Sequence, residues 1–431
     1  MKKFLAILLS ATMLLGSMGL SSAEASTKWL INSSEFLTGK YYQRKLYYQD
    51  FYISDSIKYY NQSGKKEYDA LIIVNKNSLT SDGLSASGLI GAANGLLVPT
   101  NLKSGKFEIE HDDLNMYLGK KDLPDNIYII GGPKAINPML DSEFRKEGCN
   151  VKRIQGKNRI ETSYNIAKEI KALKGGNVTE MAVTKAYNGE ADAVSIASEA
   201  IRRKMPIILT NGSKLPKESP LGAEVKKIYA IGGPAVIKDS LIKQLKAERI
   251  GGKNRYETNA KIIKRFGKHN GVTVVSGKNE ELGNSLYAAT MDSSCPIVMT
   301  KLEPDRYIDS ISGAKTIFLA NRGISRGGAI DFLIASYGRE VFNAYKLVED
   351  INLKEIGLNS GNYLLYTPEN SHLEGSSVNP KDYIIFTPNN GYGEDSYELK
   401  YNIAVSKKNK KVYVMTEGNP ELIEVTDLMD K

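Results

Sequence analysis

The sequence predicts an α/β fold of three tandem βαβ-type units with parallel sheets, followed by a small β-rich or mixed C-terminal appendage. Three observations support this prediction: a long internal repeat, short apolar runs that alternate with amphipathic stretches, and a change in the residue pattern after residue 350. Short apolar runs between helical stretches are typical of buried parallel strands in βαβ units. Repetition of a whole unit is more typical of binding proteins than of enzymes.

The internal repeat relates residues 126–172 to residues 227–264. Both segments contain, in the same order, an apolar run, Gly-Gly-Pro, an amphipathic stretch, Arg-Ile-x-Gly-Lys-Asn-Arg, and Glu-Thr before a second amphipathic stretch. The offset is 101 residues at the glycine pair and 96 at the Gly-Lys-Asn-Arg tetrad. A period of this length is too long for a solenoid coil, so we expect each copy to be a compact unit.

A second repeated element occurs three times: an apolar run, a small-residue helix, and another apolar run that ends in Thr. Together with single runs before each glycine pair, it predicts strands at 71–75, 95–100, 127–130, 182–185, 205–210, 228–231, 272–276, 295–300 and 316–320. These strands place the units at about 27–152, 153–248 and 249–350. The outer copies have drifted, since the first keeps only an aromatic stretch around Arg44 to Tyr60 in place of Arg-Ile-x-Gly, and Asn321-Arg322 replaces the third glycine pair.

Residues 351–431 form the expected appendage. Apolar runs at 363–366 and 383–386 each precede Thr-Pro, and 401–406 and 411–416 are expected to pair as a hairpin. This segment has a net charge of −4, whereas residues 26–350 carry +12. A cationic body suggests an anionic partner, with solubility alone as the alternative interpretation.

Residues 1–25 are expected to be a secretory signal peptide. Lys2 and Lys3 precede an apolar run that reaches about Leu15, and small residues close on Ala23-Glu24-Ala25. This run is too short to span a bilayer, and the sequence has no other apolar segment of about 18 residues. We therefore expect an exported protein without membrane insertion, for which nucleic acid is not an expected partner.

Residue types for catalysis and metal binding are scarce. Cys149 and Cys295 are expected to be buried or incidental thiols, because exported proteins that depend on disulfides usually carry more cysteines. His111, His269 and His372 lack metal-ligand spacing, and no nucleotide-binding glycine motif follows a strand. The sequence thus predicts no catalytic residue, no metal and no cofactor, while a carboxylate-pair glycosidase stays open because such pairs have no fixed spacing.

The stretches Gly156–Thr162 and Gly252–Thr258 carry the strongest chemical argument. In each, an Asn and the Glu three residues later have the spacing of a capping box. Arg159 and Arg255 then fall in the first helical turn, where the helix dipole disfavours a cation. Because this misfit occurs twice, it implies an anionic partner, which is either an internal carboxylate or a ligand.

Two further motifs have structural interpretations. Gly131-Gly132-Pro133 and Gly232-Gly233-Pro234 form either an amide nest for an anion or, as we favour, a tight turn into a helix with proline at its first position. Asp192, with Asp82 and Asn284 at equivalent places, is expected to cap the following helix.

Taken in order, these motifs resemble the cell wall-binding repeat type 2 family of clostridial-type surface proteins. The resemblance covers roughly residues 60–345, with departures at Gly95, where the family has proline, and at the lost third glycine pair. It implies a pseudo-threefold block that attaches the protein non-covalently to an anionic secondary polysaccharide of the Gram-positive wall. It also makes S-layer or other surface proteins candidate partners.

The expected polymer-binding residues are cations from two copies. They are Arg153, Lys157, Arg159, Arg249, Lys253 and Arg255. We therefore expect a secreted, non-enzymatic protein of the cell wall and surface. The alternatives are an exported wall-processing hydrolase and an adhesin whose activity lies in residues 351–431.

Overall fold

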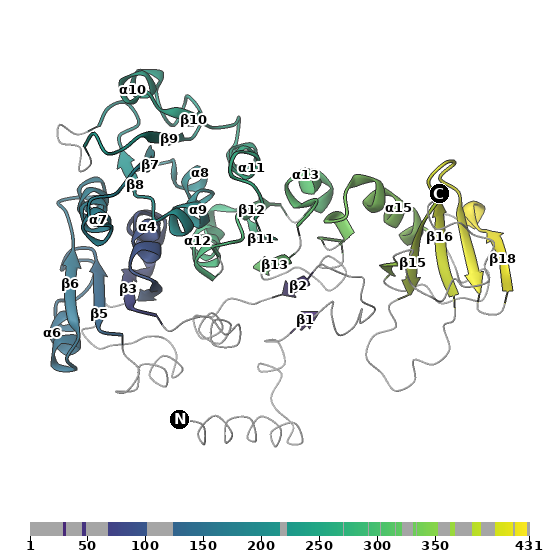
Figure 1. Ribbon diagram of the computed structural model, residues 1–431, viewed down its shortest axis with the longest axis horizontal. Coiled ribbons are helices and arrows are strands. Elements are labelled where there is room, and N and C mark those ends of the chain that lie inside the picture. Colours follow the sequence, from purple (N-terminus) through teal and green to yellow (C-terminus); the bar gives the residue numbers. More distant parts are fainter. Residues whose placement is uncertain are drawn as a thin grey trace, which may run out of the picture.

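The fold is described from a computed structural model (Figure 1). The structure describes residues 68–100, 124–215, 222–269, 271–291, 293–301, 303–314, 316–320, 331–332, 334–351, 382–388, 401–416 and 419–428, and the strand residues 29–31, 45–48 and 363–366. The expected signal peptide lies outside the described residues. None of the helices among the described residues has the length and apolarity needed to cross a membrane.

The first sheet is parallel and has the strand order β4-β3-β5-β6. Its strands are β3 (Ala70–Asn75), β4 (Gly95–Thr100), β5 (Asn126–Ile130) and β6 (Asn150–Ile154), and its helices are α4 (Leu84–Ala92) and α6 (Met139–Lys146). Side chains of β3 are buried on both faces, which explains why this strand is a continuous apolar run.

The second sheet repeats this order as β10-β9-β7-β8, again with all strands parallel. Its strands are β7 (Glu180–Lys185), β8 (Ile207–Thr210), β9 (Lys227–Ile231) and β10 (Glu248–Ile250). The helices of this part are α7 (Arg159–Leu173), α8 (Glu190–Val194), α9 (Ala197–Arg203) and α10 (Asp239–Leu245).

The third sheet, in the order β1-β2-β13-β11-β12, is completed by strands from the start of the chain. Its elements are β11 (Gly271–Ser276), β12 (Ile297–Thr300), β13 (Thr316–Ala320), β1 (Trp29–Ile31), β2 (Lys45–Tyr48), α11 (Arg255–Phe266), α12 (Leu282–Met291) and α13 (Ile308–Ile311). β2 pairs in parallel with β13, so it takes the place that β6 and β10 hold in the other sheets (Figure 1). Residues 45–48 lie within the range expected for the first unit, yet they join the sheet of the third.

Three equivalent helices, α4, α9 and α12, contact one another at the centre of the block. Small residues make this close packing possible. A Cβ atom on Gly88 would collide with the carbonyl of Met205, and one on Gly91 with the carbonyl of Ile201. The apolar cores are shared as well, because one buried cluster joins the first two sheets and another joins the last two.

The sheets are offset from the sequence repeat. The expected unit boundaries at 152/153 and 248/249 fall inside β6 and β10. The helix that follows each of these strands packs on the next sheet, α7 beside β8 and α11 beside β12. Each Arg-Ile-x-Gly stretch therefore ends one sheet and leads to a helix of the next.

The C-terminal part has a five-stranded antiparallel sheet in the order β14 to β18, which lies at one end of the molecule (Figure 1). It comprises β14 (Tyr363–Tyr366), β15 (Tyr383–Pro388), β16 (Tyr401–Ser406), β17 (Val412–Thr416) and β18 (Asn419–Glu424), with α15 (Arg339–Glu349) before it. Phe342 and Tyr345 of α15 share an apolar cluster with Phe386 of this sheet. The predicted fold class, parallel α/β units with a β-rich appendage, is confirmed.

Candidate functional site

The Gly-Lys-Asn-Arg stretch of the second copy starts helix α7. The Asn158 side chain accepts hydrogen bonds from the backbone N–H groups of Ile160 and Glu161 at 3.0 and 3.1 Å, so its predicted capping role is confirmed. Glu161 Oε2 accepts from the N–H of Lys157 at 3.0 Å, one residue earlier than a standard capping box requires. A Cβ atom on Gly156 would lie 2.5 Å from that of Glu161, which explains the glycine.

The third copy repeats these contacts at the start of α11. Asn254 accepts from two N–H groups at 3.1 and 3.0 Å, and Glu257 accepts from the N–H of Lys253 at 3.0 Å. In both copies the threonine hydroxyl that follows accepts from the glycine N–H and donates to the asparagine carbonyl. The glycine, asparagine, glutamate and threonine of the motif therefore have local structural roles.

Arg153 and Arg249, which were predicted to bind polymer, instead form ion pairs and hydrogen bonds with other residues of the protein. Arg153 forms an ion pair with Asp141 through Nε and Nη2, and its Nη1 donates to the carbonyl of Gly131 at 2.8 Å. Arg249 donates to Asp239 at 2.6 Å and to the carbonyl of Gly232 at 3.0 Å. Each arginine thus ties the strand it occupies to the glycine turn and to the helix beyond that turn.

The two glycine turns have a backbone that requires glycine. Gly131 and Gly232 adopt φ values of 119° and 127°, which side chains rarely tolerate. The favoured interpretation, a tight turn, holds, but proline is not at the first helical position. Helix α6 begins at Met139, after a turn in which the carbonyl of Gly132 accepts from two later N–H groups.

Arg159 and Arg255 differ from the first pair because only one nitrogen of each has a hydrogen-bond partner in the described part of the chain. Arg159 Nη1 donates to the carbonyl of Ala186 at 3.0 Å and lies 3.4 Å from Glu190 Oε1. Arg255 Nη1 donates to the carbonyl of Gly277 at 2.7 Å. Their other guanidinium nitrogens are therefore free to bind an anion, as far as the described residues are concerned.

Lys157 and Lys253 precede the capping asparagines and are exposed. Their backbone N–H groups are fixed by the glutamate of the same motif, as described above. Each copy thus places an exposed lysine two residues before a partly exposed arginine at a helix start.

Each of these arginines acts electrostatically on a buried carboxyl group. Burial raises the pKa of Asp82 above its usual range, while Ser78 and the charge of Arg159 oppose this shift. Burial likewise raises the pKa of Asp192, against the opposing effects of Thr258 and Arg255. The expectation that Asp192 caps a helix was wrong, because it lies within α8, whose N-terminal residue is preceded by Gly189.

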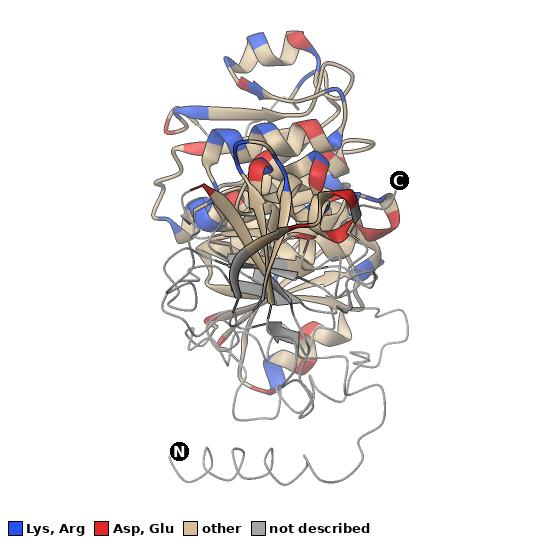
Figure 2. Ribbon diagram, turned by 90° about the vertical axis from the view of Figure 1, so that its right-hand side faces the viewer, with Lys and Arg blue, Asp and Glu red and all other residues tan. Residues whose placement is uncertain are grey.

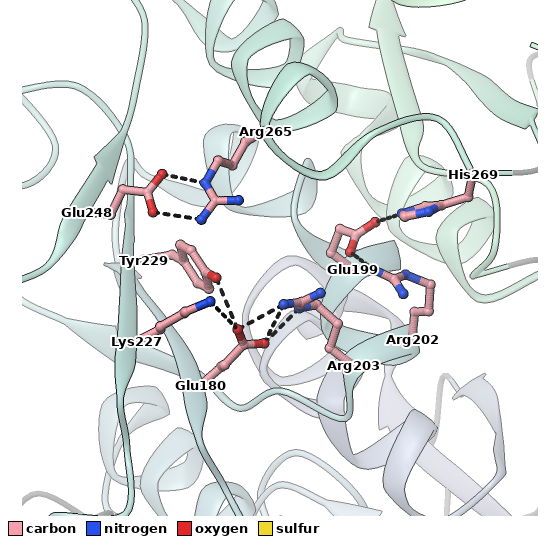
Figure 3. A network of polar contacts seen from close by, with 9 residues as sticks. All are labelled: Glu180, Glu199, Arg202, Arg203, Lys227, Tyr229, Glu248, Arg265 and His269. Carbon is pink, nitrogen blue, oxygen red and sulfur yellow. Dashed lines mark hydrogen bonds and ion pairs between the residues drawn. The ribbon is translucent and has the colours of Figure 1, made fainter.

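A second group of charges, which the sequence did not indicate, lies where the second and third units meet (Figure 3). It comprises Glu180, Glu199, Arg202, Arg203, Lys227, Tyr229, Glu248, Arg265 and His269. Glu180 accepts two hydrogen bonds of 2.8 Å from Arg203, and Glu248 accepts bonds of 2.6 and 3.1 Å from Arg265.

The most buried carboxylate of this group is Glu199, which accepts from Arg202 at 2.6 Å and lies 2.7 Å from His269 Nε2. Burial alone would raise the pKa of Glu180, but hydrogen bonds and charge from Arg203 lower it instead. The arginines of this group therefore pair with carboxylates of the protein. Two of its contacts link the second unit to the third, His269 with Glu199 of α9 and Arg265 with Glu248 of β10.

Basic and acidic residues both occur throughout the α/β block. In Figure 2, Lys and Arg segments alternate with Asp and Glu segments over the α/β block. The net positive charge of residues 26–350 thus does not by itself locate a site, and individual pairing of the arginines is more informative. Cys149 and Cys295 are buried thiols, as predicted, and form no disulfide with each other.

Two segments of the chain match a known family of domains. Residues 153–242 and 249–333 match the model of cell wall binding domain 2, CWB2. These segments begin at Arg153 and Arg249, so each match starts on the last strand of one sheet and continues into the next.

Two curated relatives come from Bacillus subtilis (strain 168). The amidase enhancer is 37% identical over 148 residues, which is 33% of this chain and 19% of that protein. The N-acetylmuramoyl-L-alanine amidase LytC is 27% identical over 184 residues, which is 41% of this chain and 35% of that protein. The chain therefore spans only about a fifth to a third of the length of these relatives.

Two solved structures from Clostridium difficile share the fold. Cwp6 has a TM-score of 0.58 at 24% identity over 68% of this chain and 48% of its own. Cwp8 has a TM-score of 0.56 at 23% identity over 71% of this chain and 54% of its own. The resemblance drawn from the sequence is thus confirmed at residues 153–242 and 249–333, whose match to cell wall binding domain 2 supports an association of the chain with the cell wall.

Proposed function

We propose that the protein is exported and held non-covalently on the cell wall, because its repeats bind an anionic secondary polysaccharide. The observation that supports this most strongly is the contrast between two pairs of arginines. Arg153 and Arg249 are satisfied by carboxylates and carbonyls of the protein, whereas Arg159 and Arg255 use a single nitrogen each among the described contacts.

The free nitrogens suit a phosphate or carboxylate group of a polymer. A guanidinium group presents its N–H donors in a planar fork that matches such anions, and its charge strengthens each hydrogen bond. Lys157 and Lys253 add an exposed point charge beside each arginine. We therefore remove Arg153 and Arg249 from the six predicted polymer-binding residues. The proposed binding residues are Lys157, Arg159, Lys253 and Arg255.

The test is binding of the purified protein to cell walls, with and without their anionic polymer. The variant Arg159→Gln/Arg255→Gln removes the positive charge of both candidate arginines. The matched control is Lys168→Gln/Lys264→Gln, because these exposed lysines lie nine residues further along the same two helices. Nine helical residues correspond to about 14 Å, so the control removes equal charge away from the site.

We expect the wild type to prefer walls that retain the polymer and the arginine variant to lose at least about tenfold in affinity, which corresponds to about 1.4 kcal/mol. The lysine control should bind like the wild type. Equal binding of the wild type to stripped walls, or equal losses in the two double variants, would refute the proposal.

We also propose that the block binds without catalysis. Asp82 and Asp192 are equivalent carboxyl groups in two units, and the third unit has Asn284 at this place. Both carboxyl groups lie against a glycine turn and feel the charge of an arginine, which supports a structural role at the place where the turn and the helix start meet. Release of soluble fragments from purified peptidoglycan by the full chain would contradict this view.

A further inference from the structure

An exposed aromatic ring lies beside one of the two candidate arginines. Tyr187 follows β7 in the loop that leads to α8, and 52% of its surface is exposed. The other large hydrophobic residues exposed in the described part of the chain are Met139, Leu173 and Ile423, so Tyr187 is the aromatic member of this set. The Tyr187 ring is therefore accessible to a molecule outside the fold.

The ring of Tyr187 is held in place by the arginine. Arg159 Cζ lies 4.4 Å from the centre of the Tyr187 ring, within the range of a cation–π contact. The guanidinium is itself fixed by the carbonyl of Ala186 and by Glu190, whose Oε2 accepts from the N–H of Gly189 at 3.0 Å. A planar group that is already ordered loses little conformational entropy when a ligand packs on it.

This arrangement has the chemistry of a subsite for an anionic sugar. The C–H groups on one face of a pyranose ring form an apolar surface that packs on an aromatic ring, while the hydroxyl of tyrosine stays in water. Arg159 Nε and Nη2 have no hydrogen-bond partner among the described residues, and they lie next to that ring. We propose that Tyr187 and Arg159 together bind one sugar residue that carries a phosphate or carboxylate group.

The helix starts at Arg159 and Arg255, each with the loop that its arginine contacts, form two equivalent junctions. The subsite would be particular to the first of them. Arg255 donates to the carbonyl of Gly277 as Arg159 does to that of Ala186, so Lys278 is the counterpart of Tyr187. Lys278 can attract an anion but offers no ring for stacking. The ring nearest the junction at Arg255 is Tyr256, which packs against Gly277 and Tyr307 of the protein. The junction at Arg159 would therefore bind a sugar and its charge, whereas the junction at Arg255 would bind mainly through charge.

This inference rests on the proposed function, and its test uses the full chain and the same purified walls. Tyr187→Ala removes the ring, Tyr187→Phe keeps the ring but removes the hydroxyl, and Met139→Ala is a control at another exposed apolar residue. We expect Tyr187→Ala to weaken wall binding about tenfold, which corresponds to about 1.4 kcal/mol. Tyr187→Phe and Met139→Ala should stay within about twofold of the wild type.

Two treatments of the walls identify the anion. Hydrofluoric acid removes polymers linked through phosphodiesters, and carbodiimide coupling to a neutral amine removes carboxylate charge. The treatment that removes the binding anion should abolish the difference between wild type and Tyr187→Ala.

The possible failures can be told apart. If the wild type binds stripped and unstripped walls equally, the proposed function fails. If the wild type prefers polymer but Tyr187→Ala binds within twofold of it, with an unchanged melting temperature, only the sugar subsite is overturned. A loss in Tyr187→Phe equal to that in Tyr187→Ala would also overturn stacking.

Discussion

The junctions at Arg159 and at Arg255 share a backbone and differ in what surrounds their guanidinium groups. In both, asparagine, glutamate and threonine make the same hydrogen bonds, and one arginine nitrogen donates to a carbonyl of the next loop. Around Arg159 there are Glu190 and the ring of Tyr187, for which the other junction has no recorded equivalent among the described residues.

The comparison separates the part of the motif that builds the fold from the part that can meet a ligand. Contacts that recur in both junctions satisfy backbone groups at a helix start, where four N–H groups lack intrahelical partners. Side chains that differ between the junctions lie at the surface. They belong to the loops that follow β7 and β11, the strands at which the second and third sheets begin along the chain. We therefore expect the helix caps to contribute equally to stability at both junctions, and ligand binding to differ between them.

The largest expected effect concerns the arginines that are used inside the fold. Arg153 and Asp141 have side chains only 12% and 11% exposed, so Arg153→Ala should cost about 3 kcal/mol of unfolding free energy, because it leaves a buried carboxylate unpaired. The partner of Arg249, Asp239, is 74% exposed, and Arg249→Ala should cost only about 1 kcal/mol. Urea denaturation of both variants measures this difference, and equal costs would contradict it.

The helix caps should give a smaller and equal effect at the two junctions. Asn158→Ala and Asn254→Ala each remove an acceptor for two backbone N–H groups, which is expected to cost about 1 kcal/mol. Serine at the same positions should restore most of the loss. A cap that costs several times more at one junction would show that the two starts are not equivalent.

The smallest expected effect depends on pH and concerns Asp192. Its pKa is raised by burial, and its Oδ1 atom is buried without a hydrogen-bond partner in the described structure. Between the unfolded value of about 3.9 and the raised folded value, the native state holds more protons, so stability from this group increases as the pH falls. Asp192→Asn, which copies Asn284 of the next unit, should remove that dependence.

The measurement for Asp192 is the difference in unfolding free energy between wild type and variant from pH 7 to pH 4. The difference isolates Asp192 from carboxylates with the opposite behaviour, such as Glu257, whose pKa is lowered by the N–H of Lys253 and by Lys261. The free energy of unfolding of the wild type should increase relative to that of Asp192→Asn as the pH falls. Parallel curves would contradict the burial of this carboxyl group.

Much of the fold was predictable from local pattern. The apolar runs at 127–130, 228–231 and 316–320 became β5, β9 and β13 within one residue, because a strand buried on both faces must be apolar throughout. The tail strands β14 to β17 were also expected from apolar runs, whereas β18 was not. Pairing of β2 with β13 was not predictable, since it joins residues about 270 positions apart and leaves no local pattern.

The candidate site was only partly predictable. Sequence spacing located the helix starts and the capping residues, because those contacts are local. It could not separate Arg153 from Arg159, since their partners Asp141 and Ala186 are fixed by the turn after β5 and the loop after β7. The exposure of Tyr187 could not be predicted from the sequence, because it depends on tertiary packing.

The salt dependence of wall binding tests the central claim most directly. Affinity of the full chain for purified walls is measured from low to high ionic strength for the wild type, Arg159→Gln/Arg255→Gln and Lys168→Gln/Lys264→Gln. If the junction arginines bind polymer anions, salt should weaken the wild type and the lysine control with the same steep slope, and the arginine variant with a shallower one. Binding of the wild type that does not respond to salt, or one slope shared by all three proteins, would contradict the claim.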